Sequence, residues 1–249
     1  MLGSSQSIAS PNVVLNTIMA QELEEFADIL EQSNDFQVDL QNLLHDTFKA
    51  HQRIIFNGNG YGEDWVQEAQ RRGLSNLRDT VDCMPAYIDP KNIRLFAGHN
   101  ILSETEMRAR YEIHLENYCK VTAIEASTLR DMVLRGILPA VNRYTADLTQ
   151  AILHKRELVV PCRVEEDLLQ KLSALTGSLY DTMAAINEAM DKAPDAEGGI
   201  DAARYYREEI VRRMEEARQS IDQLESLTAA KYWPYPRSEE HTSELQSLV

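Results

Sequence analysis

The feature that most constrains this chain is a helical pattern that runs from Ser103 to His154. Ser103 and Glu106 form an S-x-x-E capping box, which marks the start of a helix. Apolar side chains then return every three or four residues, with charged side chains between them. This stripe comprises Met107, Tyr111, Leu115, Tyr118, Leu129, Val133, Ile137, Ala140, Tyr144, Leu148 and Ala151. We therefore expect one very long helix over about 104–154, roughly 75 Å in length at about 1.5 Å per residue.

A proline interrupts this helical pattern. Pro139 has no backbone N–H, and its ring clashes with the carbonyl group of Arg135. Gly136 lies close by, yet the apolar stripe stays in phase across both residues. The pattern therefore predicts a kink in the helix and not its end. The basic residues 154–156 close the helix, where positive charge is favourable.

The rest of the chain also shows helical spacing. We expect helices at about 12–32 and 36–55 and a short helix near 65–72 that ends at Gly73. Over 74–102 we expect irregular structure with short helical pieces, one of them capped by Asp89 with Pro90 at its first position. Two apolar stripes, 164–190 and 210–228, flank a polar loop at 192–201 and predict a C-terminal antiparallel helical hairpin with a coiled-coil-like seam. The hairpin most simply packs on the long helix. Because no stretch shows sustained strand alternation, we expect an all-α fold, an elongated helical bundle.

Charge and composition narrow the classes of partner. The formal net charge of −15 argues against nucleic acid or an anionic membrane surface as a partner. The sequence shows neither a signal-peptide pattern nor an apolar run as long as a membrane span. Cys83, Cys119 and Cys162 fit no disulfide framework and no zinc motif, so we expect a reducing, cytoplasmic location. We expect Cys119 to be a buried, inert thiol.

A glycine-rich stretch, FNGNGYGED at 56–64, allows two interpretations. Gly58 and Gly60 could cradle a phosphate, or they could end the preceding helix in the left-handed conformation. The stretch matches neither G-x-x-x-x-G-K-[ST] nor G-x-G-x-x-G, and no strand precedes it. We therefore favour helix termination.

The remaining candidate ligands for a metal or a reacting group are sparse. Glu112 and Glu116 lie four residues apart with His114 between them, a spacing that is typical of a solvated helix face. His45 and His51 are six residues apart and point to different faces of their helix. The sequence contains no G-x-S-x-G, P-loop or H-E-x-x-H motif. We therefore predict no catalytic, cofactor-binding or metal-binding residue in this chain.

Three stretches together carry a resemblance to a known family. They are FNGNGYGEDWVQEAQRRGLSNL at 56–77, LFAGHNILSETEMRARYEIHLENYCKVTAIEASTL at 95–129 and ILPAVNRY at 137–144. In this order they resemble the C-terminal helical region of the type III glutamine synthetases. The opening GSSQSIASPNVVLNTI at 3–18 looks like the junction that follows the catalytic domain of that family. The resemblance covers residues 3 to about 234.

The resemblance implies an ATP-dependent ligase that joins ammonia to glutamate through a γ-glutamyl phosphate with magnesium or manganese. The family's active site lies between subunits of a homo-oligomer of two stacked hexameric rings. Its metal ligands, ATP contacts and substrate arginines lie in a catalytic domain that would precede Met1, so none is placed here. The chain would then be a non-catalytic structural and assembly region whose partners are its own catalytic domain and sister subunits. The alternative is a free-standing helical interaction module that binds an amphipathic partner helix.

The far end of the chain departs from the family. From Arg237 the sequence RSEEHTSELQS looks like the translation of a sequencing-adapter oligonucleotide, and we expect it to be unpacked. The expected organisation is a junction remnant at 1–10, a helical C-terminal domain at 11–234 and an artefactual, disordered tail at 235–249. The sequence leaves open whether the 57–61 loop reaches a neighbouring active site.

Overall fold

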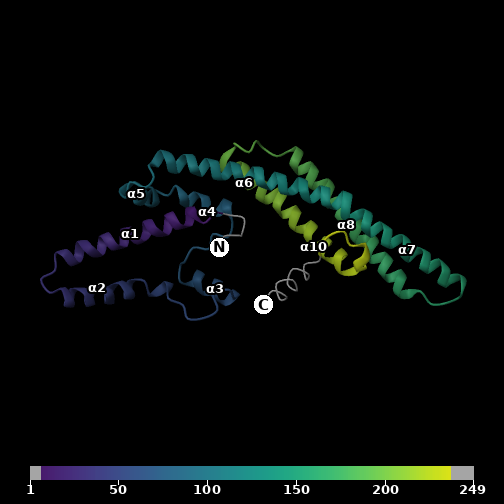
Figure 1. Ribbon diagram of the computed structural model, residues 1–249, viewed down its shortest axis with the longest axis horizontal. Coiled ribbons are helices and arrows are strands. Elements are labelled where there is room, and N and C mark those ends of the chain that lie inside the picture. The colour runs from purple at the N-terminus through teal and green to yellow at the C-terminus, as the bar shows by residue number, and fades with distance from the viewer. Residues whose placement is uncertain (1–6, 237–249) are drawn as a thin grey trace. The chain divides into compact units, whose positions relative to one another are not determined.

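The computed structural model describes residues 7–236, and every regular element in that range is a helix (Figure 1). The all-α prediction is therefore confirmed for this part of the chain. The predicted unpacked tail from Arg237, and most of the predicted junction at 1–10, lie outside the described residues. The chain divides into two compact units after Ile113.

The first unit opens with two helices joined by a short turn, α1 (Ala9–Glu31) and α2 (Phe36–Ala50), as Figure 1 shows. Asp35 caps α2 by accepting a hydrogen bond from the backbone N–H of Val38 at 3.3 Å. Helix α2 ends five residues before the predicted 55, and a 3₁₀ turn, η1 (Gln52–Ile54), follows it.

Three short helices follow in the first unit, and local capping chemistry explains some of their boundaries. They are α3 (Glu63–Arg71), α4 (Thr80–Tyr87) and α5 (Pro90–Gly98). Asp89 caps α5, accepting from the Lys91 N–H at 2.9 Å with Pro90 at the first helical position, as the sequence indicates. Gly73 ends α3 with a φ of 71°. His99, the C-cap residue of α5, forms a hydrogen bond with Gln21 of α1, and its Nε2 lies 2.9 Å from the Gln21 Oε1.

The predicted long helix is present and continuous through Pro139. It consists of α6 (Glu104–Met132), a π-helical turn η2 (Val133–Ile137) and α7 (Leu138–Glu157). The capping box forms as expected. The Glu106 carboxylate accepts a hydrogen bond from the Ser103 backbone N–H at 2.8 Å, and the Glu106 backbone N–H donates to the Ser103 hydroxyl at 3.3 Å. In η2 the N–H of Leu138 donates to the carbonyl of Val133, five residues back. This wider turn accommodates Pro139, which cannot donate.

The predicted C-terminal hairpin forms the core of the second unit, with α8 (Arg163–Asp191) packed on α7 and on α10 (Arg212–Leu227). Its second arm begins earlier than predicted, with α9 (Gly199–Tyr205) and a π-helical turn η3 (Tyr206–Val211) running into α10. The seam is closed by fully or almost fully buried side chains: Leu172, Leu179, Met183, Ile186, Ile210, Ala217, Ile221 and Leu224. Burial of apolar area at this seam is the main stabilising contribution in the unit.

A short C-terminal segment, residues 229–236, lies against the long helix and contains the 3₁₀ turn η4 (Ala230–Tyr232). The rings of Tyr144 and Tyr232 lie 5.2 Å apart, and the Tyr232 hydroxyl donates to Asp147. The Tyr235 hydroxyl donates to the carbonyl of Met132 at 3.3 Å, beside η2. Within residues 7–236, no helix combines the length and the apolar character that a membrane crossing requires.

Candidate functional site

The glycine-rich stretch folds into a braced loop between η1 and α3. The rings of Phe56 and Trp65 stack at 4.3 Å between centroids with an interplanar angle of 28°. The Arg72 guanidinium lies 5.9 Å and 5.8 Å from the centroids of these two rings. Its Nη1 also donates to the carbonyls of Arg53 at 3.1 Å and Ile55 at 2.8 Å. Arg72 thus ties the chain that enters the loop to the end of α3.

An acidic side chain holds Arg72 in place. Glu68 accepts hydrogen bonds from Nε of Arg72 at 2.5 Å and from Nε and Nη2 of Arg71, both at 2.7 Å. These hydrogen bonds, with the Arg71 contribution the largest, lower the pKa of Glu68 from its ordinary 4.5 to about 2. Glu68 is therefore ionised at neutral pH and keeps the guanidinium aimed at the loop.

The interpretation of Gly58 and Gly60 as helix terminators is wrong. Helix α2 has already ended at Ala50, and the glycines with positive φ in residues 7–236 are Gly73 and Gly199. Gly58 has a different constraint, because a Cβ there would lie 2.6 Å from Cζ of the stacked Phe56 ring. A glycine is needed for close approach to an aromatic ring, and no left-handed conformation is involved.

The alternative phosphate-cradle interpretation also meets a physical objection. The Tyr61 N–H donates to the Asn59 side chain at 3.0 Å, and the Gly62 N–H donates to the Asn59 carbonyl at 3.2 Å. Both backbone donors are therefore occupied by the loop itself. Glu63 and Asp64 follow in the first turn of α3, where two carboxylates oppose binding of another anion.

The tip of this braced loop projects into solvent. Asn57 and Asn59 are exposed, and Tyr61 is exposed to 103% of its reference area. The loop therefore combines internal bracing with a tip whose aromatic side chain packs on none of the described residues.

A second unusual surface belongs to α1 and α2. Thr17 is the one buried residue of α1, and α2 buries none. We use the term hairpin surface for the apolar side chains of these helices that are 42–65% exposed: Val13, Leu15, Ile18, Met19, Leu23, Ile29, Phe36, Val38, Leu44 and Phe48. Exposed apolar side chains in this number are typical of surfaces that contact another layer of protein.

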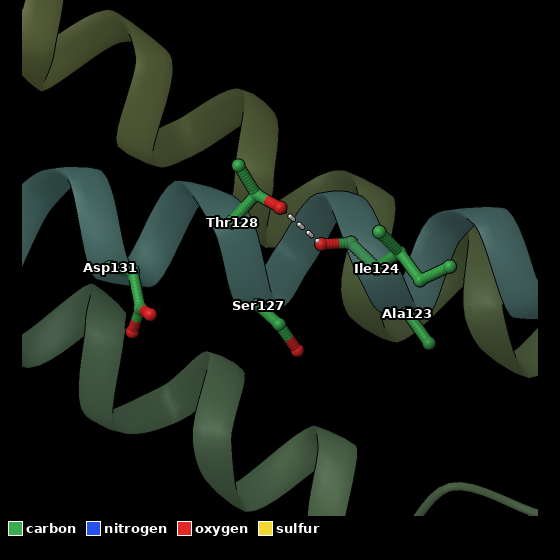
Figure 2. A pocket seen from close by; sticks show the side chains of 5 residues that line it. All are labelled: Ala123, Ile124, Ser127, Thr128 and Asp131. Atoms are coloured by element: carbon green, nitrogen blue, oxygen red, sulfur yellow. Dashed lines mark hydrogen bonds between the residues drawn. The ribbon is translucent and has the colours of Figure 1, made fainter.

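A groove of about 320 Å³ lies along one face of α6, lined by Ala123, Ile124, Ser127, Thr128 and Asp131 (Figure 2). Its polar groups are largely engaged within the protein. The Thr128 hydroxyl donates to the Ile124 carbonyl at 2.8 Å, and Asp131 pairs with Arg130 at 3.3 Å and Arg135 at 3.8 Å. The groove offers no converging set of polar groups that would select a ligand.

The sequence candidates for ligands do not converge. Glu112 and His114 are exposed on α6, and Glu116 pairs with Lys120 one turn further along. Cys119 is fully buried, and burial raises the pKa of its thiol, as expected of an inert cysteine. The part of the chain that the structure describes contains no group of three or more metal-binding side chains.

No sequence pattern indicated the bracing role of Arg72. The signal that could have found it is the pair of aromatic residues, Phe56 and Trp65, at the two ends of a glycine-rich loop.

Exposed His45 lies 3.0 Å from Asp46, and exposed His51 is the C-cap residue of α2. Both histidines therefore lie on α2 and its C-cap, outside the braced loop.

Comparison with known proteins places these features in a family context. Residues 39–156 match a family model described as the glutamine synthetase C-terminal domain. The chain is 33% identical over 233 residues to a glutamine synthetase of Butyrivibrio fibrisolvens, covering 93% of this chain and 31% of that protein. It is 31% identical over 253 residues to a type-3 glutamine synthetase of Dictyostelium discoideum, covering 96% of this chain and 34% of that protein. A glutamine synthetase of Bacteroides fragilis is 28% identical over 248 residues, again with 96% and 34% coverage. The chain thus spans about a third of the length of the curated relatives that it matches.

Proposed function

The chain belongs to the glutamine synthetase C-terminal domain family, and from this premise we propose that it forms the helical C-terminal part of a type III glutamine synthetase. Such an enzyme is an ATP-dependent ligase that joins ammonia to glutamate. The part described here braces the catalytic part and supports assembly of the subunits, and it does not catalyse the reaction alone. ATP and magnesium or manganese bind to the catalytic part, in the cytoplasm.

The observation that carries this proposal is the hairpin surface. Helices α1 and α2, of 23 and 15 residues, bury one residue between them and expose most of their apolar side chains. Helices draw most of their stability from packing an apolar face against another layer. The relatives are about three times as long as this chain, so the missing layer is supplied by the catalytic part of the same ligase.

The test is a chimera in which this chain replaces the matching region of the Butyrivibrio fibrisolvens protein. We expect the chimera to assemble, measured by analytical ultracentrifugation, and to synthesise glutamine. Replacing Leu15, Leu23 and Phe48 with serine should reduce assembly, because these side chains are 60–65% exposed and would contact the added layer. The matched control replaces the similarly exposed Val164 and Tyr180 of α8 with serine.

The chain alone provides the second arm of the test. With glutamate, ammonia, ATP and magnesium, it should release no phosphate above the blank. Turnover by the chain alone, or unchanged assembly of the triple-serine chimera, would contradict the proposal.

The alternative function, a free-standing helical interaction module, is favoured by the same hairpin surface, because amphipathic partner helices bind to such apolar faces. Genomic DNA upstream of the first codon separates the two. An in-frame catalytic domain supports the ligase, whereas a stop codon and a promoter support the module.

A further inference from the structure

The base of the 56–62 loop is braced by contacts that do not involve its tip. The Phe56–Trp65 stack closes its base, and Arg72 binds the carbonyls of Arg53 and Ile55 just before it. Glu68 fixes Arg72 in turn. A loop that is ordered before binding loses little conformational entropy on binding, so its side chains can contribute to affinity efficiently.

The side chain that this loop presents is suited to be an interface anchor. Tyr61 is fully exposed and stands between two exposed asparagines and the start of α3. Tyrosine is enriched among the residues that dominate binding energy, since it buries a large apolar ring and keeps a hydroxyl for hydrogen bonding. The Asn57 amide and the side-chain amide nitrogen of Asn59 add polar groups beside it, whereas the Asn59 Oδ1 already accepts from the Tyr61 N–H.

The charged residues near the loop tip indicate which kind of partner surface would bind the tip. Exposed Glu63 and Asp64 follow directly on Tyr61 and Gly62. Of the nearby cations, Arg71 and Arg72 are engaged by Glu68, and Arg53 lies before the loop, in η1. The tip is therefore aromatic with an acidic flank, which complements a cationic surface. A second copy of this region is a poor match, because it carries the same acidic flank and a formal net charge of −15.

We propose that the 56–62 loop is a preformed anchor whose Tyr61 inserts into a cationic pocket on the catalytic part of the ligase. This inference rests on the proposed function, because a ligase for glutamate and ATP binds anionic substrates and therefore needs cationic side chains. The loop is thus a specific point of attachment, in addition to the broad apolar contact of the hairpin surface.

The experiment places a photoreactive benzoyl-phenylalanine at position 61 of the chimera described above and identifies the cross-linked peptides by mass spectrometry. We expect cross-links to a peptide of the catalytic part that contains lysine or arginine. The control places the same group at position 180, because Tyr180 is also exposed, at 59%, but lies in the second unit.

Tyr61→Ala separates anchoring from folding. It should lower the melting temperature of the chimera by roughly 2 °C or more, since one anchoring side chain is lost. It should leave the melting temperature of this chain alone unchanged within about 1 °C, because exposed positions contribute little to folding. Arg72→Ala, which removes the bracing, should reduce the cross-link yield from position 61 several-fold.

Three results would overturn the inference: cross-links from position 61 only to a second copy of this region, an equal yield to the same peptide from position 180, or a Tyr61→Ala chimera with unchanged melting. An active, assembled chimera with any of these results would contradict the anchor alone. A chimera that neither assembles nor synthesises glutamine would contradict the proposed function as well.

Discussion

At the residue scale, sequence alone predicted features whose causes lie within a few positions along the chain. The Ser103–Glu106 capping box, the Asp89 cap and the Gly73 stop depend on neighbouring backbone groups, and the structure contains all three. Gly58 was misinterpreted because its constraint is the Phe56 ring, whose position is set by stacking on Trp65 nine residues later. Sequence spacing does not reveal the direction in which such a ring points.

The depressed pKa of Glu68 leads to a prediction about acid. A carboxylate with a lowered pKa in the folded state stabilises that state above its ordinary pKa of 4.5, and this contribution is lost as pH falls toward about 2. In a Trp233→Phe background, Trp65 is the remaining tryptophan and reports on the loop. We expect its fluorescence to stay constant down to about pH 4.5 and then to change toward pH 2 as Arg72 is released.

Glu68→Gln serves as the control for this titration. The variant should show an altered Trp65 signal already at neutral pH, because a neutral amide no longer holds two guanidinium groups. It should also lose the change between pH 4.5 and pH 2. An identical acid titration in Glu68→Gln would mean that Glu68 does not brace the loop.

At the element scale, the hydrophobic period predicted helices well and their internal irregularities poorly. The stripe of 103–154 stays in phase across Pro139, and the structure is helical throughout 104–157. The spacing of apolar residues could not distinguish a kinked α-helix from the π-helical turn η2, because both keep the same helix face toward the core. The apolar pattern predicts that the second arm of the C-terminal hairpin starts near 210, but the structure starts it at α9. The first buried residues of this arm, Ala202 and Ala203, are too small to form a recognisable apolar stripe.

The η2 turn gives a prediction for Gly136 and Tyr235. A Cβ on Gly136 would lie 2.4 Å from the Tyr235 hydroxyl and 3.0 Å from its Cζ. Gly136→Ala therefore gains about 0.5–1 kcal/mol of helical preference but displaces Tyr235 and its hydrogen bond to Met132. We expect a smaller gain, or a net loss, in the wild-type background.

The double-mutant cycle isolates this steric conflict. In a Tyr235→Ala background the same Gly136→Ala change should raise the free energy of unfolding by about 0.5–1 kcal/mol, because no ring remains to displace. Urea unfolding of the four proteins measures both steps. Equal effects of Gly136→Ala in the two backgrounds would show that Tyr235 does not occupy the space above Gly136.

At the scale of the whole molecule, sequence predicted the fold class but not the location of the core. An apolar stripe shows that a helix has a face to bury, and the stripes of α1 and α8 look alike in this respect. The structure covers the stripe of α8 and leaves much of that of α1 exposed. Whether a face is covered depends on partners that lie elsewhere in the chain or in another protein, and no local pattern encodes them.

This difference predicts unequal stability of the two units in the chain alone. Amides of α8 and α10 should exchange slowest with solvent, because their seam is buried, while those of α1 and α2 should exchange through local opening at low free energy. Leu179→Ala in the seam should cost about 2–5 kcal/mol of unfolding free energy. Leu15→Ala, at a site 60% exposed, should cost less than about 0.5 kcal/mol.

Hydrogen exchange followed by mass spectrometry measures the protection of each helix, and the same experiment on the chimera shows what covers the hairpin surface. In the chimera, protection of α1 and α2 should rise and Leu15→Ala should become costly, since the catalytic part then supplies the missing layer. Val164→Ala is the matched control, because this residue is 75% exposed on α8 and should stay neutral in both proteins. Strong protection of α1 in the chain alone would mean that these helices need no added layer, and the bracing role would lose its physical basis.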